Sequence, residues 1–370
     1  MVMKKVLFTA TVDSHILNFH IPFLKWFKNQ GYEVHVASKG NSAIPFVDIK
    51  HNVPFNRSPY NKANIKAYRE MKNLIKKYNY ELIHCHTPMG SVLTRLAAIN
   101  VSKKRTTVIY TAHGFHFFKG APLINWLLYY PIEKWMSRST DCLITINEED
   151  YNLVEKNFKS SKIKLVNGVG INLDKFQPQT SEKKAFLRSE QKYNDSDFIL
   201  FFAGELSFRK NQELLISVIS ILKEKIPNIK LLLAGEGDLS DKYKQMVNNL
   251  GLSDNIHLLG YRNDVKDLLL MSDIAVSSSR QEGLPVNIME AMATGLPLIV
   301  TDCRGNRDLV KDFNNGFVIK LHDIEGFADK IYELYANGEL RKRFSQNNLE
   351  IINNYSIELI ERWEIFMNTI

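Results

Sequence analysis

Short apolar, β-branched runs alternate with amphipathic stretches along the whole chain. In the first half, the runs predicted as strands are Lys5–Thr11, Glu33–Ala37, Leu82–His86, Val108–His113, Cys142–Ile146 and Lys164–Val166. In the second half they are Ile199–Ala203, Lys230–Ala234, His257–Leu259, Ile274–Ser277, Pro297–Thr301 and Phe317–Lys320. The predicted helices include Ile16–Asn29, Ile65–Tyr78, Leu123–Ser137, Glu148–Phe158, Gln212–Lys225, Lys242–Leu250, Val286–Thr294 and Ile324–Asn337. Strands that alternate with helices in this way are typical of parallel sheets covered on both faces.

The alternation restarts after a polar stretch, Gln177–Asp197, so we expect two domains. A length of 370 residues agrees with this division, because single domains usually hold about 100–200 residues. The predicted class is therefore α/β, with two Rossmann-like, doubly wound parallel sheets in residues 1–180 and 181–355. Ligands of such sheets bind beyond the carboxyl ends of the strands, so functional residues should follow strands.

The composition, with 45% hydrophobic and 24% charged residues, is that of an ordinary globular protein. The cysteines at positions 85, 142 and 303 are far apart and lack CxxC spacing, which favours a reducing compartment. The apolar run after MVMKK is only about seven residues long, is followed by Asp13, Ser14 and His15, and lacks a small-residue cleavage site, so it is interpreted as a first strand and not as a signal peptide. No run reaches the roughly 18 apolar residues of a membrane span, so we expect a protein of the cytoplasm or of a membrane surface.

Charge is distributed unevenly along the chain. Residues 1–185 carry a net charge of +14 and residues 186–370 a net charge of −6. This asymmetry indicates that the first half faces nucleic acid, a lipid surface or phosphorylated ligands. No nucleic-acid-binding motif with interleaved aromatic residues is present, so we do not expect nucleic acid as a partner.

The glycine-rich loops do not form a known nucleotide fingerprint. Gly168–Gly170 and Gly235–Gly237 each lack the third glycine of GxGxxG, and there is no GxxxxGK[ST]. The loop GEGD at Gly235 follows a predicted strand and precedes a helix. Its backbone N–H groups could approach a ligand there, and the alternative is a turn without a function.

The segment EGLPVNIME, from Glu282 to Glu290, follows a predicted strand and opens a helix. Pro285 suits the first turn of that helix, where its missing N–H costs nothing. The free N–H groups of the turn and the helix dipole favour an anion such as a diphosphate. Glu290 lies about one turn further, where its carboxylate could accept hydrogen bonds from vicinal hydroxyls such as those of a ribose. The alternative is a helix with two solvated glutamates.

Two cations, Arg209 and Lys210, precede the helix that follows the strand Ile199–Ala203. Cations at a helix N-terminus oppose the helix dipole, so they do not stabilise the helix. Facing a diphosphate, they would stabilise a departing leaving group. A solvated pair is the alternative.

The segment from Ser277 to Val310, SSSRQEGLPVNIMEAMATGLPLIVTDCRGNRDLV, resembles the retaining, nucleotide-sugar-dependent enzymes of glycosyltransferase family 4 (group 1). The similarity extends over nearly the whole chain, in GELSFRKNQ, LLLAGEGD, LLGYRNDV and NGVGINLDKF. HCHTPMGS and TAHGFHFFKGAP are most similar to bacterial capsule and exopolysaccharide enzymes. The resemblance implies the GT-B fold, with a central cleft between the two domains and a C-terminal helix, residues 356–370, packed back on the first domain.

The resemblance also implies individual roles. Glu290 would hold the ribose and Glu282 would lie by the donor sugar, while Arg209 and Lys210 would bind the diphosphate. His113 would contact the sugar hydroxyls or the acceptor, and it completes a catalytic set with Glu282, Arg209 and Lys210. The donor-binding residues would be Gly204, Glu205, Gly235, Gly237, Tyr261, Arg262, Gly283, Leu284, Pro285, Val286 and Glu290. Many members carry Arg where this chain has Glu205, and Arg209 is expected to supply the missing charge.

On the acceptor side we expect Ser14, His15, His86 and His116. His84, His86, His113 and His116 follow or end neighbouring strands, where four histidines could bind zinc. No carboxylate or cysteine lies at a recognisable ligand spacing, so we expect no metal site, and for His113 the alternative is a hydrogen-bonded structural histidine. The DxD at Asp195–Asp197 precedes its strand and is interpreted as part of a solvated linker.

The stretch Asn61–Tyr80 is basic. Ile65, Tyr68, Met71 and Ile75 are expected on its apolar face. The opposite, basic face could dock on anionic lipid, each residue adding about 1 kcal/mol, and a solvated surface helix is the alternative. Its residues recur at helical spacing and are Lys62, Lys66, Arg69, Lys72 and Lys76.

These observations predict a retaining glycosyltransferase that moves a hexose or N-acetylhexosamine from a UDP-sugar to a lipid-linked, undecaprenyl-diphosphate-type saccharide in surface polysaccharide synthesis. No cofactor or metal is expected to be required. The expected partners are the nucleotide sugar, the lipid-linked saccharide, the anionic inner face of the cell membrane and other polysaccharide-assembly enzymes. The alternatives are transfer to a small soluble acceptor, a sugar-nucleotide epimerase, and a non-catalytic nucleotide-sugar-binding module.

Overall fold

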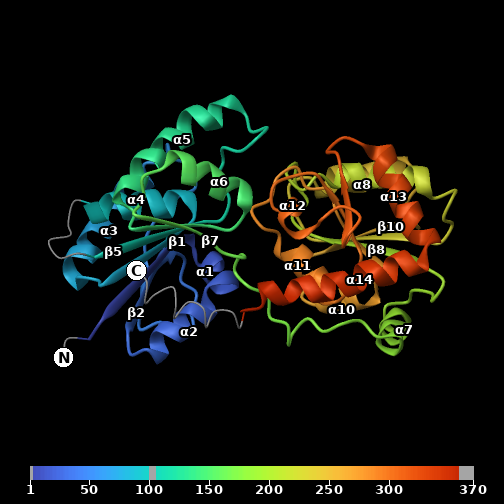
Figure 1. The fold of residues 1–370 in the computed structure, drawn as a ribbon, viewed down its shortest axis with the longest axis horizontal. Helices are drawn as coiled ribbons and strands as arrows, with labels where there is room; N and C mark the ends of the chain where they lie inside the picture. Colours follow the sequence, from blue (N-terminus) through green and yellow to red (C-terminus); the bar gives the residue numbers. More distant parts are fainter. Residues whose placement is uncertain (1–2, 100–105, 358–370) are drawn as a thin grey trace. The chain divides into compact units, whose positions relative to one another are not determined.

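The computed structural model describes residues 3–99 and 106–357 (Figure 1). It divides into two compact units that part between Val169 and Gly170, and each unit is described by itself. The predicted boundary after residue 180 therefore falls inside the second unit. Residues 358–370, which make up most of the predicted C-terminal helix, lie outside the described part of the chain.

The first unit is a seven-stranded sheet in the order β3-β2-β1-β4-β5-β6-β7, and every neighbouring pair is parallel. Helices α1 and α2 cover one face, while α3 to α6 cover the other (Figure 1). The strands are β1 Lys5–Val12, β2 Glu33–Lys39, β3 Ile49–Asn52, β4 Leu82–His86, β5 Thr107–Ala112, β6 Cys142–Thr145 and β7 Lys162–Leu165. The helices are α1 Asp13–Phe19, α2 Ile21–Asn29, α3 Ala63–Tyr78, α4 Pro88–Ile99, α5 Leu123–Met136 and α6 Glu148–Asn157.

The second unit is a six-stranded parallel sheet in the order β10-β9-β8-β11-β12-β13. Its strands are β8 Phe198–Ala203, β9 Ile229–Ala234, β10 Ile256–Gly260, β11 Ile274–Ser277, β12 Leu298–Thr301 and β13 Gly316–Ile319. Its helices are α7 Ser181–Glu190, α8 Gln212–Leu222, α9 Ser240–Asn249, α10 Val265–Met271, α11 Val286–Ala293, α12 Asn306–Leu309, α13 Ile324–Ala336 and α14 Gly338–Ile352. Both sheets confirm the predicted doubly wound α/β class.

Two local features differ from the predicted elements. The helix predicted over Ile16–Asn29 is broken at His20 into α1 and α2, because Pro22 in the first turn of α2 has no N–H with which to continue α1. The strand β3, with sequence IKHN, was not predicted. It is a short edge strand with one apolar residue, so it carries no alternation of apolar and polar positions.

The polar stretch Gln177–Asp197 packs on the second unit and is not a linker between units. The buried Arg188 of α7 donates to Asp273 at 2.7 Å. The Gln179 amide donates to the main-chain carbonyls of Leu270 and Ser272. Within the described residues, no helix has both the length and the apolar character needed to cross a bilayer.

Candidate functional site

An ion cluster joins the loops that follow β8 and β11. Lys210 Nζ lies 2.6 Å from Glu282 Oε1, and Arg209 Nη1 lies 3.1 Å from Glu282 Oε2. Arg304, in the loop after β12, donates to the main-chain carbonyl of Glu282 at 3.0 Å. The structure thus brings together three of the predicted catalytic residues, and it pairs the two cations with the carboxylate between them.

Two side-chain donors and one main-chain donor bond to main-chain carbonyls and hold the two loops together. Ser278 donates to the carbonyl of Lys210 at 2.9 Å, and Asn211 donates to the carbonyl of Ser278 at 3.1 Å. Arg280 N donates in turn to the carbonyl of Arg209 at 2.8 Å. Asn211 adopts a left-handed conformation, with φ of 57°, which turns the chain from the loop into α8. These bonds fix Lys210 against Glu282 from two segments that are 72 residues apart in sequence.

Glu282 is ionised in this setting. Its side chain is only 8% exposed, and burial by itself would raise the pKa of this carboxyl. The charges of Lys210 and Arg209 outweigh that cost and lower the pKa below its ordinary value. Arg209, whose side chain is 44% exposed, still reaches solvent, whereas Lys210 is almost enclosed.

Helix α11 begins directly after this cluster. The segment Gly283-Leu284-Pro285 leads into its first residue, Val286, with Pro285 at the N-cap position. The first N–H groups of a helix have no partner within it and carry partial positive charge, so they suit an anion. Asn287 in the same turn donates to the carbonyl of Ala203 and anchors the helix to the end of β8.

Glu290 lies one turn further along α11 and is in a different electrostatic state. Its side chain has no hydrogen-bond partner among the described residues, and burial raises its pKa to about 7, against a weak opposing attraction by Lys175. The carboxylate is therefore poised between its two forms near neutral pH. Such a group gains most from a ligand that donates hydrogen bonds to it.

The loop GEGD at Gly235 has a structural reason for its glycines. A Cβ on Gly235 would lie 2.1 Å from the carbonyl oxygen of Gly204, and one on Gly237 would lie 2.3 Å from that of Leu206. The loops after β8 and β9 therefore pack backbone against backbone beside the ion cluster. Gly235 N also donates to the carbonyl of Gly260, which ties in the loop after β10.

The remaining predicted donor residues lie at the edges of these loops. Tyr261 follows β10 and is 73% exposed, and Arg262 donates through Nε to Asp264 at 2.7 Å. Glu205 is exposed, and its carbonyl accepts from Gln212. Glu205 takes no part in the ion cluster, where Arg209 supplies the exposed positive charge.

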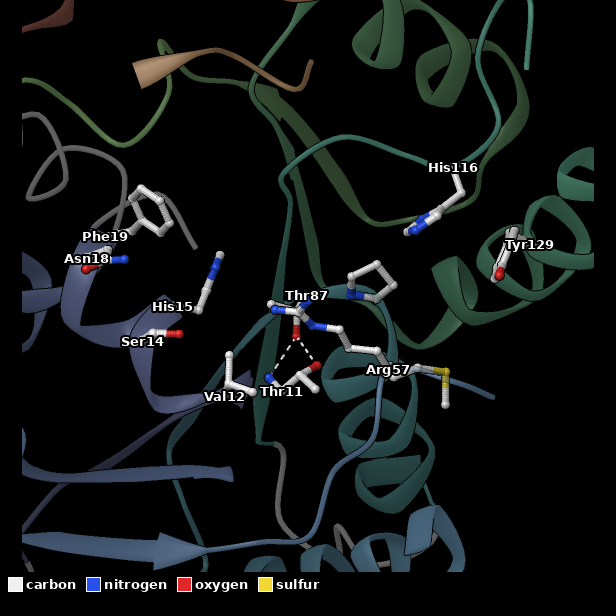
Figure 2. Close-up of a pocket in the computed structure, with 12 residues that line it drawn as sticks. Thr11, Val12, Ser14, His15, Asn18, Phe19, Arg57, Thr87, His116 and Tyr129 are labelled. Carbon is white, nitrogen blue, oxygen red and sulfur yellow. Dashed lines mark hydrogen bonds between the residues drawn. The ribbon is translucent and has the colours of Figure 1, made fainter. Parts of the chain in front are cut away.

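The first unit carries a cavity of about 380 Å³ at the carboxyl ends of β1 and β4 (Figure 2). Three of the predicted acceptor-side residues, Ser14, His15 and His116, line it. The cavity is also lined by Arg57, which the sequence gave no reason to select, and by the N-terminus of α4. Thr87, just before α4, has a φ of 63°, which is uncommon for a β-branched residue, and its hydroxyl accepts from Thr11 N at 2.9 Å.

Beside this cavity lies a cluster of histidines: His15, His20, His86 and His113. Burial and mutual repulsion hold the pKa values of His20, His86 and His113 well below the ordinary value, and burial with the nearby Arg57 lowers that of His15 to about 4. All four are therefore neutral at pH 7. The predicted acceptor residue His86 is buried in this cluster and is not among the cavity-lining residues.

The histidines that lie together in the structure differ from the four considered from the sequence, which were His84, His86, His113 and His116. His84 donates to or accepts from Thr111 at 2.8 Å, and His116 lines the cavity, so neither joins the cluster. His15 and His20 join it from α1 and from the α1–α2 junction, where no sequence spacing connects them with the later histidines.

Two helices on the same face of the first sheet differ in their surfaces. On α3 the five predicted basic residues are all exposed, while Ala67, Met71 and Ile75 are buried. Ile65, expected on the apolar face, is 57% exposed. On α5 an apolar row faces solvent, formed by Leu123, Ile124, Leu127, Leu128, Ile132 and Trp135. The sequence predicted α5 as a helix but not this exposed row.

The family model for glycosyl transferases group 1 matches residues 183–350, and the model for glycosyl transferase 4-like domains matches residues 5–147. A relative from Bacillus subtilis (strain 168), named as the glycosyltransferase EpsD, is 45% identical over 357 residues, or 95% of this chain and 93% of that protein. The chain is a group 1 glycosyltransferase. A relative from Escherichia coli, UDP-Gal:alpha-D-GlcNAc-diphosphoundecaprenol alpha-1,3-galactosyltransferase, is 30% identical over 80% of this chain and 78% of its own length.

The GT-B fold is also shown by solved structures. The crystal structure of Anabaena HepE in complex with UDP-glucose superposes with a TM-score of 0.82 at 17% identity, over 99% of this chain and 100% of that one. WaaG, a glycosyltransferase involved in lipopolysaccharide biosynthesis, superposes with a TM-score of 0.76 at 17% identity, over 97% of this chain and 98% of its own. The predicted family and fold of this glycosyltransferase are confirmed.

Proposed function

We propose that this glycosyltransferase moves a hexose or N-acetylhexosamine from a UDP-sugar to a lipid-linked, undecaprenyl-diphosphate-type saccharide, with retention of configuration, in surface polysaccharide synthesis. The observation that carries the donor part is the Lys210–Glu282–Arg209 cluster in front of the N-terminus of α11. A diphosphate at the helix N-terminus would meet the α11 N–H groups and the exposed guanidinium of Arg209. Glu290, one turn on, would then lie where a ribose can donate its hydroxyls to the carboxylate.

The proposed chemistry is substitution on one face of the sugar. The bond between the anomeric carbon and the diphosphate oxygen breaks while the acceptor oxygen bonds to the same face of that carbon. The acceptor proton passes to the leaving phosphate, so no protein base is needed. The cations of Arg209 and Lys210 stabilise the charge that develops on the leaving group. This step requires no metal ion.

In this scheme Glu282 partly neutralises the positive charge of Arg209 and Lys210 and holds both side chains in place. It neutralises part of their charge before a donor arrives and keeps Lys210 buried in one position. The loop after β8 is therefore preorganised, and little reorganisation is left for the reaction itself. Ser14 and His116, which line the cavity of the first unit, are proposed to contact the acceptor.

The cavity of the first unit suits an anionic acceptor. It combines the exposed guanidinium of Arg57 with the N-terminus of α4, where Met89 and Gly90 follow Pro88. A lipid-linked diphospho-saccharide carries its negative charge beside the sugar, and the name of the Escherichia coli relative describes an acceptor of this kind. We propose that the phosphates of the acceptor bind here.

A lipid-linked acceptor places the enzyme at the inner face of the cell membrane, and two neighbouring surfaces support this. Helices α3 and α5 flank α4 on one face of the sheet. The basic face of α3 would attract anionic headgroups, and the apolar row of α5 would enter the headgroup region. We propose that α3 and α5 together form a peripheral membrane contact, close to other polysaccharide-assembly enzymes.

Release of nucleoside diphosphate from UDP-, GDP- and ADP-sugars tests the transfer. Each donor is incubated with and without a membrane extract that holds lipid-linked saccharides, and Glu290→Ala is compared with the surface control Glu350→Ala. We expect release from a UDP-sugar only with extract, lost in Glu290→Ala and kept in Glu350→Ala. Release of nucleoside diphosphate with a small soluble acceptor in place of the extract would indicate that the enzyme transfers sugar to soluble acceptors. Consumption of donor without any acceptor would indicate an epimerase, and binding without release would indicate a non-catalytic module.

Arg57→Ala tests the acceptor cavity separately. We expect a KM for the lipid-linked acceptor raised at least tenfold, with the KM for the UDP-sugar unchanged, because Arg57 belongs to the first unit and the donor contacts to the second. The same KM for both substrates as in the wild type would refute the assignment of the cavity.

Vesicle sedimentation tests the membrane contact. With Lys66, Arg69 and Lys76 changed to Glu, binding to vesicles with an anionic lipid fraction should fall at least tenfold at low salt. The matched control changes three exposed lysines of the second unit, Lys225→Glu, Lys244→Glu and Lys320→Glu, which gives the same change in net charge. An equal loss of vesicle binding in both variants would mean that only the net charge of the protein matters. Unchanged vesicle binding by the α3 variant would refute the proposed membrane contact.

A further inference from the structure

The histidine cluster of the first unit contains more nitrogen atoms than it has hydrogen-bond partners. Both ring nitrogens of His20 and the Nε2 atoms of His15 and His86 are buried without a partner. His20 is 2% exposed and His86 is 1% exposed. A buried polar group without a hydrogen-bond partner destabilises the free protein, and a ligand that uses these nitrogens would recover that cost.

Four of the ring nitrogens, one from each histidine, lie close together. One nitrogen from each of His15, His20, His86 and His113 lies within 4.8 Å of those of all the others. His86 Nδ1 and His113 Nε2 are already 3.2 Å apart. Two nitrogens bound to one tetrahedral zinc ion, with bonds of about 2.0–2.1 Å, lie about 3.3 Å apart.

The ring positions agree with one ion at the centre. Four imidazoles around a tetrahedral zinc ion place their ring centroids about 5 Å apart. The centroid of His15 lies 4.7 Å from that of His113, 5.1 Å from that of His20 and 6.0 Å from that of His86. The centroid of His113 lies 5.6 Å from that of His20 and 5.5 Å from that of His86. The stacked pair His20–His86, at 3.7 Å, is the one that must open.

The chemistry of the ligand set selects the class of ion. Four neutral imidazoles, with no carboxylate in the cluster, suit zinc, copper or nickel and do not suit magnesium or calcium, which prefer oxygen ligands. The aromatic ring of Phe8 lies against His84 and His86, and that of Phe19 lies against His15. His15 also lines the cavity of the first unit, which gives the ion a path from solvent (Figure 2).

We propose that His15, His20, His86 and His113 bind one transition-metal ion, with Zn²⁺ as the reference ion. The site joins α1, the α1–α2 junction, the end of β4 and the residue after β5. A closed site with four protein ligands is structural and leaves no position for a reacting water. It is therefore distinct from the transfer chemistry proposed above, which needs no metal. His15, His86 and His113 therefore hold the ion and do not take the acceptor-side and catalytic roles that the sequence predicted for them, and contact with the acceptor is left to Ser14, Arg57 and His116.

The test uses the full chain without a polyhistidine tag. After treatment with a chelator, the protein is titrated with Zn²⁺ against a chromophoric competitor, and Co²⁺ is used as a spectroscopic substitute. We expect one equivalent of zinc per chain, an X-ray absorption spectrum with four nitrogen neighbours, and the intense visible bands of tetrahedral Co²⁺. Free zinc at 100 times its Kd should raise the melting temperature of the first unit by about 5–10 °C.

The variants His20→Asn and His86→Asn each remove one ligand, and His84→Gln is the matched control. His84 is equally buried and adjacent, but its Nε2 is bonded to Thr111. We expect zinc affinity to fall at least 100-fold in both ligand variants and less than threefold in the control. If a ligand variant does not fold, the X-ray absorption and Co²⁺ spectra of the wild type still show whether four nitrogen atoms bind the ion. Six-coordinate spectra, less than one equivalent of zinc, or equal losses in the control would overturn the proposal.

Discussion

Glu290 offers a direct link between the electrostatics of the free protein and donor binding. Its carboxylate is half-buried on α11 without a hydrogen-bond partner among the described residues, and desolvation raises its pKa from 4.5 to about 7. The change Glu290→Gln keeps the size and polarity of the side chain and removes its ionisation. The exposed Glu350 on α14 gives a matched control, Glu350→Gln.

The magnitude follows from linkage between protonation and folding. Between pH 4.5 and pH 7 the folded protein holds a proton on Glu290 that the unfolded chain has released, so stability falls as the pH rises through this window. A shift of this size corresponds to about 3 kcal/mol at 1.36 kcal/mol per pKa unit. Between pH 5 and pH 8, the free energy of unfolding of Glu290→Gln should therefore rise by about 2–3 kcal/mol relative to the wild type.

The same ionisation controls the proposed ribose contact in the opposite direction. Only the carboxylate offers two charged acceptor oxygens, one to each hydroxyl, because the protonated acid and the amide of Gln each use one of the two positions as a donor. About one tenth of Glu290 is ionised at pH 6 but about nine tenths at pH 8. UDP affinity of the wild type should rise up to about tenfold over this range relative to Glu290→Gln. Titration of the UDP phosphate affects both proteins equally and cancels in this ratio.

The assays are urea denaturation at pH 5, 6, 7 and 8, and calorimetric UDP binding at pH 6 and 8. The reasoning about burial is refuted if the difference in unfolding free energy is flat with pH, or if Glu350→Gln shows the same slope. A pH-dependent stability without a pH-dependent UDP affinity would keep the raised pKa and remove the ribose contact.

Further outcomes follow from the neighbouring contacts. Glu282→Ala leaves Lys210 buried without its partner, so the free energy of unfolding should fall by about 3–5 kcal/mol in urea denaturation. The double change Glu282→Leu with Lys210→Met should recover most of that stability without recovering sugar transfer; recovered transfer would show that the pair acts only in folding. Gly235→Ala should cost about 3 kcal/mol or more, because its Cβ would meet a backbone oxygen at 2.1 Å and φ is 146°. Leu127→Ser on α5 should weaken vesicle binding even at high salt, where the α3 contribution is screened; unchanged binding would exclude α5 from the contact.

The fold was predictable because its signals are local. The strands of the second sheet are predicted by short apolar runs, such as LLLA before Gly235. Their alternation with helices predicts that neighbouring strands are parallel. The donor segment was predictable for the same reason, since Pro285 and Glu290 belong to one short stretch of sequence. The predicted boundary after residue 180 assigns α7 to the second domain, and the buried Arg188, which donates to Met271 and Asp273, holds α7 on the second unit. The compact units part somewhat earlier, between Val169 and Gly170, where no change in composition marks the division.

What the sequence could not supply is proximity between distant segments. Arg209 and Lys210 were expected to face a diphosphate, but their partner in the free protein is Glu282, 72 residues away from Lys210. His20 lies in a stretch that predicts an uninterrupted helix, so nothing placed it beside His86. The exposure of the apolar row on α5 could not be predicted, because an apolar helix is usually interpreted as buried. Only the packing of the folded chain shows which face of the helix the core leaves exposed.

The residues that break local rules gather where parallel strands end. Lys210 opposes a helix dipole after β8, the half-buried Glu290 has no partner among the described residues on the helix after β11, and Thr87 has a positive φ after β4. Buried histidine nitrogens without partners belong to His86, at the end of β4, and to His15 and His20, on and just after the helix that follows β1. Each of these features costs stability in the free protein. Apolar or uncharged side chains would avoid the cost at Lys210, Glu290 and the histidines, and glycine would avoid it at Thr87. Their concentration at the edges where doubly wound sheets bind ligands is best explained if ligands recover that free energy.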